Sequence, residues 1–254
     1  MNATFLRIDL VRQLREVTTV GFTIGLPVVM YIVFGSTFAS GDAPVGHGNA
    51  RFYVLSAMAA YGASVATTTI TGAAAIEQMQ GWGRQLALTP LRPAGYVATK
   101  VFVALVVAFA AVVAVFATGL LTGAKIDSLG RWVATFVIAW LVATLFALYG
   151  LAVVQLFRSE SAIGIGSASL VLFAFFGNLF VPLSGTILQV ARWTPMYGYA
   201  GLVRYPQMEG RTIDSGQGST HTDPLWALVL NAVVWAVVFA AISVWAVRRG
   251  RRRQ

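Results

Sequence analysis

The sequence predicts an all-α integral membrane protein with six transmembrane helices. Six stretches carry no Asp, Glu, Lys or Arg, and each is at least 24 residues long: 17–41, 52–76, 101–124, 132–157, 161–191 and 224–247. A helix needs about 20 mostly apolar residues to cross the hydrocarbon core of a bilayer. The mean hydropathy of +0.74 agrees, as does a charged fraction of 11%, since charged residues make up about a quarter of a soluble domain. We expect residues 1–254 to form one membrane domain, with spans at 18–38, 52–76, 101–123, 132–157, 161–180 and 224–247.

The basic residues predict the orientation of these spans. With the N-terminus in the cytoplasm, the inner segments hold twelve basic and four acidic residues, and the outer segments hold six and five. Positive residues favour the cytoplasmic side, so we expect a multi-pass protein with both termini inside. The basic tail, residues 248–253, then meets anionic lipid headgroups, an interpretation that we favour over nucleic-acid binding. No cleaved signal peptide is expected, because the first apolar run is too long for its hydrophobic region.

The first segment, residues 3–17, is predicted to be an amphipathic helix that lies in the membrane interface. Its apolar face consists of Leu6, Leu10, Leu14 and Val17. The alternative is a cytoplasmic extension of span one. Span one itself contains Gly21, Gly25 and Pro27. Glycines four residues apart permit close approach of another helix, and a proline bends its helix, so these residues predict either tight packing within the subunit or the seam of a dimer.

Span two is small and mildly polar, with Thr67, Thr68 and Thr69 in succession. Hydroxyl groups in a helix can bond back to the backbone, so lipid exposure is compatible with this pattern. Three adjacent threonines nevertheless favour a packed or hydrated surface. Helix packing and a transport path remain the two alternatives for it.

The fifth charge-free run is too long for one span, and Asn178, Pro182 and Gly185 interrupt it. We expect a crossing over 161–180, followed by two short helices within 183–204 that re-enter the outer leaflet. Non-helical backbone at membrane depth must be buried in protein or line a wet cavity. The candidates for the pathway and its outer gate in this segment are Phe176, Asn178, Phe180, Pro182 and Pro195.

The spans offer no group for catalysis or for ion coupling. None contains the ionisable residues that proton and sodium pumps normally place inside the membrane, so a secondary transporter is disfavoured, although sodium sites built from threonine and carbonyl oxygens stay open. His221 beside Asp223 is a weak candidate for a metal, and we expect none there. The chain has no cysteine and no GxxxxGKS or GxxxxGKT phosphate loop. Energy must therefore come from another polypeptide, and we expect neither an enzyme nor a bound cofactor.

A polar segment, residues 77–100, separates spans two and three and is the largest cytoplasmic feature. Glu77 is predicted to begin a short helix that runs to Leu88. Thr89 and Pro90 then fit a helix stop and restart, with the threonine as cap and the proline in the first turn. A compact elbow of this kind favours a docking site for a partner, and the alternative is an ordinary interfacial loop.

Two segments of the chain resemble permeases of the ABC-2 type transporter family. The first is Leu88-Thr89-Pro90-Leu91-Arg92-Pro93, leading to Lys100. The second is Phe176-Gly-Asn-Leu-Phe-Val-Pro182-Leu-Ser-Gly185, followed by Trp193-Thr-Pro195. The likeness extends to the N-terminal helix and the six-span order. It implies the ABC-2 exporter fold, in which two permeases pair and each binds a separate ATPase subunit that holds ATP and Mg²⁺.

The resemblance also implies roles for particular residues. Segment 77–88 would be the coupling helix that sits in a cleft of the ATPase. The coupling residues would be Glu77, Gly83, Arg84, Leu86, Leu88, Thr89, Pro90, Arg92 and Pro93. Spans one, two and five would face the pathway and the second permease copy, and the helices after Pro182 would gate the outer side.

The apolar, aromatic and hydroxyl-bearing spans favour a hydrophobic or amphiphilic substrate, namely a drug, an antibiotic or a lipid. An alternative is export of a polysaccharide or glycolipid, which other members of the family carry out. Another is a secondary transporter or channel that works without ATP. A further class of function is an embedded enzyme or a structural membrane protein, and no catalytic constellation supports an enzyme. The Ala-, Val-, Gly- and Arg-rich composition indicates a bacterial protein, whose place would be the plasma membrane.

Overall fold

The structure is a computed structural model that describes residues 3–37, 41–77, 93–157, 159, 161–212 and 221–251. Helices make up most of it: α1 (Ala3–Arg15), α2 (Val17–Thr37), α3 (Ala50–Glu77), α5 (Pro93–Leu121), α6 (Leu129–Leu141), α7 (Thr144–Phe157), α8 (Ser161–Phe176), α9 (Gly185–Ala191), α10 (Pro195–Met208) and α11 (Leu225–Arg251). Two antiparallel hairpins complete it. β1 (Pro44–Val45) pairs with β2 (Gly48–Asn49), and β3 (Arg211–Thr212) pairs with β4 (His221–Thr222).

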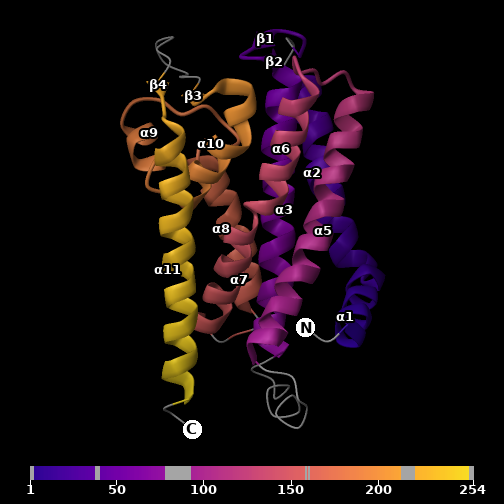
Figure 1. Ribbon diagram of the computed structural model, residues 1–254, viewed down its shortest axis with the longest axis vertical. Coiled ribbons are helices and arrows are strands. Elements are labelled where there is room, and N and C mark those ends of the chain that lie inside the picture. Colours follow the sequence, from indigo (N-terminus) through magenta and orange to yellow (C-terminus); the bar gives the residue numbers. More distant parts are fainter. Residues whose placement is uncertain are drawn as a thin grey trace.

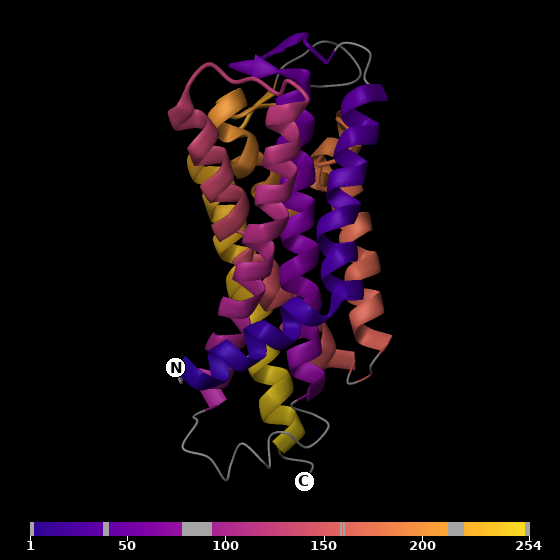
Figure 2. The same ribbon diagram turned by 90° about the vertical axis from the view of Figure 1, so that its right-hand side faces the viewer.

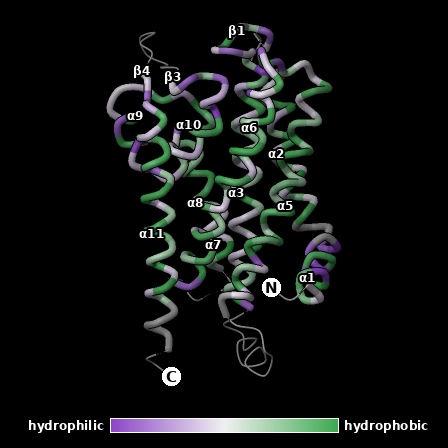
Figure 3. The backbone as a smooth tube through the Cα atoms, in the orientation of Figure 1, coloured by the Kyte–Doolittle hydropathy of each residue, from purple (hydrophilic) through white to green (hydrophobic). Residues whose placement is uncertain are grey.

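The long helices run side by side along one axis, and the two ends of the bundle differ (Figure 1). α1 lies across one end, beside the last turns of α3 and the first turns of α5 (Figure 2). We call this the inner end, and α11 also finishes there. The two hairpins, α9 and α10 lie at the opposite, outer end. Apolar residues dominate the length of the long helices, and hydrophilic residues gather in α1 and near the hairpins (Figure 3).

Three of the described helical segments are long and apolar enough to cross a membrane, judged by length and composition: Gly95–Thr122, Leu129–Phe157 and Leu225–Ala246. Two further apolar helices are shorter, Val20–Gly35 and Ser161–Phe176. The remaining predicted span, 52–76, falls within α3, a helix of small and hydroxyl-bearing residues. Helices therefore occupy all six predicted ranges, while the crossing of a membrane by all six stays a prediction.

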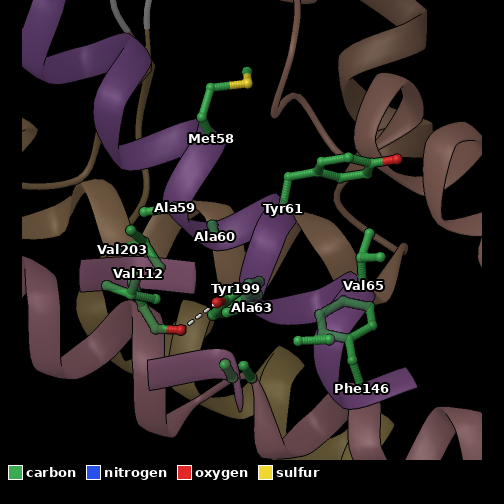
Figure 4. Packing of buried hydrophobic residues seen from close by; sticks show 14 of the residues in the cluster. Met58, Ala59, Ala60, Tyr61, Ala63, Val65, Val112, Phe146, Tyr199 and Val203 are labelled. Carbon is green, nitrogen blue, oxygen red and sulfur yellow. Dashed lines mark hydrogen bonds between the residues drawn. The ribbon is translucent and has the colours of Figure 1, made fainter. Parts of the chain in front are cut away.

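α3 forms the centre of the bundle, and every residue from Leu55 to Thr68 is buried. Its small side chains let the neighbouring helices approach. A Cβ atom added to Gly62 would lie 2.8 Å from Cγ of Pro27 in α2, so the bend of α2 packs against α3. Figure 4 shows the side chains of Tyr199 from α10 and Phe146 from α7 reaching this helix. The Tyr199 hydroxyl donates a hydrogen bond to the carbonyl of Ala139 in α6, which satisfies its polar atom inside the core.

The fourth predicted span, 132–157, is divided between α6 and α7 at Val142 and Ala143. The amide of Leu145 donates to the carbonyl of Val142 at 3.0 Å, and the amide of Phe146 donates to Ala143 at 2.9 Å. These tight turns replace the regular α-helical spacing. The carbonyl of Ala143 also accepts the Thr67 hydroxyl of α3 at 3.0 Å. A side chain that competes for helix carbonyls bends a helix. The Thr144 hydroxyl does so locally, because it donates to the carbonyl of Leu141 at 2.7 Å, so hydroxyls of both helices contribute to the division.

Candidate functional site

Charged side chains from three helices meet at the inner end and form what we call the inner cluster: Asp9, Arg12, Glu77, Tyr96 and Lys100. Lys100 Nζ lies 2.7 Å from Asp9 Oδ1 and 2.9 Å from Glu77 Oε2. Arg12 contacts the other oxygen of Glu77 and lies 3.2 Å from Asp9 Oδ1. The Tyr96 hydroxyl donates to Glu77 Oε2 at 2.8 Å. Each carboxylate therefore has two cationic partners.

Apart from Arg12, whose side chain is 53% exposed, the inner cluster is largely buried, which distinguishes it from an ordinary surface ion pair. The side chain of Lys100 is 4% exposed, that of Asp9 is 6% exposed and that of Glu77 is 21% exposed. Burial by itself raises the pKa of Glu77, but hydrogen bonds from Lys100 and Arg12 and the charge of Lys100 outweigh it, so the net pKa of Glu77 is lowered. The carboxylate is thus ionised at neutral pH, and the cluster holds two negative and two positive charges.

The positions of these residues along the chain give the cluster its significance. Glu77 is the last residue of α3, and Tyr96 and Lys100 lie one turn apart near the start of α5. The cluster therefore joins the helices on both sides of segment 78–92 and fastens α1 to them through Asp9 and Arg12. Glu77 lies in this cluster, and Pro93 begins α5. The other predicted coupling residues lie outside the described residues: Gly83, Arg84, Leu86, Leu88, Thr89, Pro90 and Arg92.

The second group of predicted site residues lies at the outer end, where α8 stops at Phe176. Asn178 adopts the left-handed conformation, with φ of 59°. Its amide donates to Phe175 at 3.3 Å, and the amide of Leu179 donates to Ala174 at 2.9 Å. These two bonds form a Schellman motif, in which a left-handed residue closes a helix. The predicted span continued to Phe180, and this motif ends the helix four residues earlier.

The chain then forms α9, which Pro182 and Pro195 bracket, and α10, which Pro195 begins. The side-chain Oδ1 of Asn178 accepts the amide of Leu183 at 2.8 Å, so the asparagine fixes both the end of α8 and the turn that follows. Thr194 caps α10 by accepting the amide of Tyr197, and Pro195 occupies the first turn, where a proline loses no hydrogen bond. Phe180 packs on Tyr61 of α3 at 4.9 Å between ring centroids.

Phe176 differs from its neighbours because its ring is 52% exposed in the isolated subunit. Lipid, substrate or a second copy of the chain are the available partners for such a ring in a membrane. Its position one turn from the Asn178 corner keeps it a candidate for the pathway.

Four ionisable side chains form a closed ring at the outer surface: His47, Asp127, Arg131 and Glu209. His47 lies 2.9 Å from Asp127 and 3.0 Å from Glu209, through different ring nitrogens. Arg131 lies 3.3 Å from Asp127 and 2.9 Å from Glu209. The hydrogen bonds from Arg131 and His47 lower the pKa of the exposed Glu209. The ring fastens the β1–β2 hairpin, the loop before α6 and the end of α10 to one another.

The threonines of span two have separable roles. The hydroxyls of Thr67 and Thr68 donate to carbonyls of Ala143 and Phe146 across the α3–α7 contact, at 3.0 and 3.2 Å. These bonds support the helix-packing alternative for both residues. Thr69 is half-buried on another side of the helix, so it is the member of the triplet to which the pathway alternative best applies.

Gly21 and Gly25 in α2 face no other part of the described subunit. A Cβ atom added at either position would have no neighbouring atom within 4 Å. Pro27, by contrast, packs against Gly62 inside the subunit. Of the two predicted uses of this segment, intramolecular packing therefore applies to the proline, and the glycine surface is free for another chain.

Residues 3–206 match the sequence profile of the ABC-2 type transporter family, from α1 into α10. The chain belongs to the ABC-2 type transporter family. The match confirms the resemblance drawn from 88–93 and 176–185. A search of curated proteins found no match to the chain. Members of the family are membrane components of ABC exporters, so this chain is a permease component and not the ATPase.

Within the ABC-2 permease, sequence reasoning missed most of the inner cluster. Lys100, the last residue of the polar segment 77–100, is buried between two carboxylates, which the sequence did not predict. A signal was nevertheless present in the sequence. Leu6, Asp9, Leu10 and Gln13 follow helical spacing on one face of α1, and in the structure this face packs against the bundle, with Asp9 and Gln13 buried. Ile8 and Val11 are the exposed apolar residues of α1.

The sequence predicts that His221 and Asp223 bind no metal ion. His221 Nε2 lies 3.3 Å from Asp223 Oδ1, and the same carboxylate also contacts Arg192 and the Tyr197 hydroxyl. Among the described residues, no group of three or more His, Asp or Glu side chains is placed to hold a metal ion.

Proposed function

We propose that this ABC-2 permease is the six-span subunit of an ATP-driven exporter in a bacterial plasma membrane, with both termini in the cytoplasm. Two copies would pair, and each would bind a separate ATPase subunit that carries ATP and Mg²⁺. The cargo would be a hydrophobic or amphiphilic small molecule, such as a drug, an antibiotic or a lipid, taken from the cytoplasm or the inner leaflet.

The observation that carries the proposal is the inner cluster. Segment 78–92, where the family resemblance places the ATPase contact, joins α3 to α5, and Glu77 at the end of α3 contacts Lys100, two turns into α5, at 2.9 Å. A displacement of this segment therefore acts on α3 and α5 together, and through Asp9 on α1. A buried ion pair stabilises a fold little when compared with apolar side chains of the same size. Fold stability alone therefore gives little reason for the inner cluster, whereas the transmission of a partner's movement does.

The exposed glycine surface of α2 supports the pairing of two copies. Glycines four residues apart let two membrane helices pack at short range, and Gly21 and Gly25 have no neighbour that already fills this space. We place the permease seam along α2, with Phe22 beside it, a side chain that is 64% exposed.

Substrate-stimulated ATP hydrolysis by the purified complex tests the coupling. In a variant that combines Leu86→Asp with Leu88→Asp, charges enter the predicted docking face while the spans stay intact. We expect the ATPase to dissociate from this variant and stimulation to fall at least tenfold. The matched control replaces Arg251, Arg252 and Arg253 with glutamine and should keep both properties. Loss of stimulation in the tail variant alone would reject the coupling role of segment 77–100.

A second measurement separates the exporter from a secondary transporter. Transport into inside-out vesicles should require ATP and persist when ionophores collapse the proton and sodium gradients. Transport that needs a gradient and proceeds without the ATPase would establish the alternative.

A further inference from the structure

Arg204 in α10 is a buried cation without an acidic partner. Its two terminal nitrogens donate to the carbonyls of Asn178 and Leu179, at 2.6 and 2.5 Å. The guanidinium also lies 4.0 Å from the centroid of the Tyr53 ring. The residue is only 7% exposed. Within the described ranges, no carboxylate lies within 4.0 Å of it, and its Nε atom has no hydrogen-bond partner.

Such a charge is costly to bury. An arginine stays protonated in proteins, and a buried ion is normally paired with an opposite charge. The two carbonyls and the ring of Tyr53 compensate part of this cost through dipoles and a cation–π contact. They supply no negative charge, so the guanidinium retains its full positive charge at this place.

A cavity of about 30 Å³ adjoins the guanidinium, between the corner after α8, Tyr53 of α3, α10, β3 and the start of α11. Arg204, Arg211, Asn178 and Thr212 contribute polar groups to its wall. Asp223 also lines the cavity, but its carboxylate already contacts Arg192 at 3.5 Å, His221 at 3.3 Å and the Tyr197 hydroxyl. The charge of the acid is thus matched, whereas that of Arg204 is not, and the wall of the cavity is positive in sum.

The size of the cavity limits what can occupy it. About 10 to 15 Å³ of such space holds one water molecule, so the cavity has room for about two waters or for one group of three heavy atoms. A carboxylate has this size and supplies the missing charge and acceptor atoms. A guanidinium has five N–H donors, and the carbonyls of Asn178 and Leu179 each accept from one terminal nitrogen; a second N–H of a terminal nitrogen would hold the carboxylate through a charge-assisted hydrogen bond.

We propose that this cavity is an anion site, in which Arg204 binds a single carboxylate group at the outer end of the permease. The carboxylate belongs either to a free small acid or to the head of an amphiphile whose chain extends into the lipid. Only the interpretation of a bound amphiphile as exported cargo rests on the proposed function. Carboxylate binding itself is a property of this chain, so it is expected even if the permease has no ATPase partner.

Radiolabelled laurate provides the test. The permease alone, in nanodiscs of zwitterionic phosphatidylcholine and at mildly alkaline pH, should bind it saturably. Unlabelled laurate should displace the label, and dodecanol, which has the same chain without the charge, should displace it at least tenfold less well. Acetate distinguishes the two sources: displacement by acetate as effective as that by laurate assigns the site to free small acids, and weaker displacement assigns it to amphiphiles.

Arg204→Gln should weaken laurate binding at least tenfold, because it removes the charge while a side-chain amide remains. Arg7→Gln is the matched control, since Arg7 is an exposed arginine of α1 at the other end of the bundle, and it should leave binding unchanged. Equal displacement by laurate and dodecanol in the wild-type protein would overturn the proposal even if Arg204→Gln fails to fold. Unchanged binding by a folded Arg204→Gln protein would overturn it as well.

Discussion

Replacement of Lys100 by methionine tests whether the inner cluster fastens α1 to the bundle. The substitution keeps an unbranched side chain of similar length but removes from Asp9 and Glu77, which are 6% and 21% exposed, the more deeply buried of their two shared cations. Loss of one partner from a buried ion pair costs about 3 to 5 kcal/mol. Arg12 remains near both acids, so we take the lower value, about 3 kcal/mol.

The variant can relieve this cost by releasing α1, because the release hydrates Asp9. The equilibrium for opening of α1 should therefore rise about 100-fold, since each 1.4 kcal/mol corresponds to a factor of about ten. The chain has no cysteine, so a single cysteine at position 13 reports this opening. Gln13 is 8% exposed on the packed face of α1, and the rate of maleimide labelling follows the population of the open state when closing is fast.

The control variant is Asp42→Asn, which breaks the exposed 3.6 Å pair with Arg51 at the outer end. It should leave labelling at position 13 unchanged, because surface pairs contribute about 0 to 1 kcal/mol and this one is remote. Asp9→Asn in combination with Lys100→Met should restore much of the protection, since it removes the unpaired acid. A rise below threefold in Lys100→Met, or no recovery in the double variant, would refute the role of the cluster.

Three further predictions follow from the same contacts and from the topology. The pKa of Glu77 in the folded protein is lowered below its usual 4.5. The ionised carboxylate therefore contributes fully to stability above pH 4.5, and this contribution is lost as the pH falls through the lower pKa of the folded state. Over that acidic range the thermal midpoint of the wild-type protein should drop, and that of Glu77→Gln should drop much less. Thr67→Val should lower the free energy of unfolding in mixed detergent by about 0.6 kcal/mol, the mean for a hydrogen bond between membrane helices, whereas Thr69→Val, which removes no bond to α7, should have little effect. Single cysteines at Ser219 and Gln254 should label from opposite faces of the membrane, and labelling from one face would contradict the predicted even number of spans.

The positions of the helices could be predicted from the sequence because long runs without charged residues mark them. Each charge-free run coincides with one helix, except 132–157, which covers the pair α6 and α7, and 161–191, which covers α8 and α9. The corner at Asn178 was also predictable, since an asparagine followed by Pro182 and Gly185 interrupts an apolar run. The division at Val142 was harder to predict. Part of its cause is the Thr67 hydroxyl of α3, 76 residues away in sequence, and the local contribution, the Thr144 hydroxyl on the Leu141 carbonyl, is a weaker signal than a proline or a glycine.

The inner cluster was harder to predict because its contacts are non-local. Asp9 and Lys100 are 91 residues apart, and an acid on an amphipathic helix is compatible with exposure to water as well as with burial. Arg204 presents the same difficulty. It lies near the end of a predicted short helix, and only the folded chain shows that the carbonyls of Asn178 and Leu179 and the ring of Tyr53 enclose it.

The distribution of polar contacts along the bundle indicates where the permease can change shape. Ion pairs connect helices at the two ends, through the inner cluster and through the ring that contains His47 and Arg131. Between them, α3 and α7 are joined by hydroxyl–carbonyl bonds such as Thr67 to Ala143. Such a hydrogen bond contributes about 0.6 kcal/mol to stability on average. Breaking a buried ion pair costs about 3 to 5 kcal/mol. Between α6 and α7 the amides of Leu145 and Phe146 already donate three residues back instead of four, so a bend at this point breaks fewer regular hydrogen bonds than one elsewhere in the helices. A force applied at the inner end is therefore expected to move α3 and α5 as one unit and to be absorbed between α6 and α7.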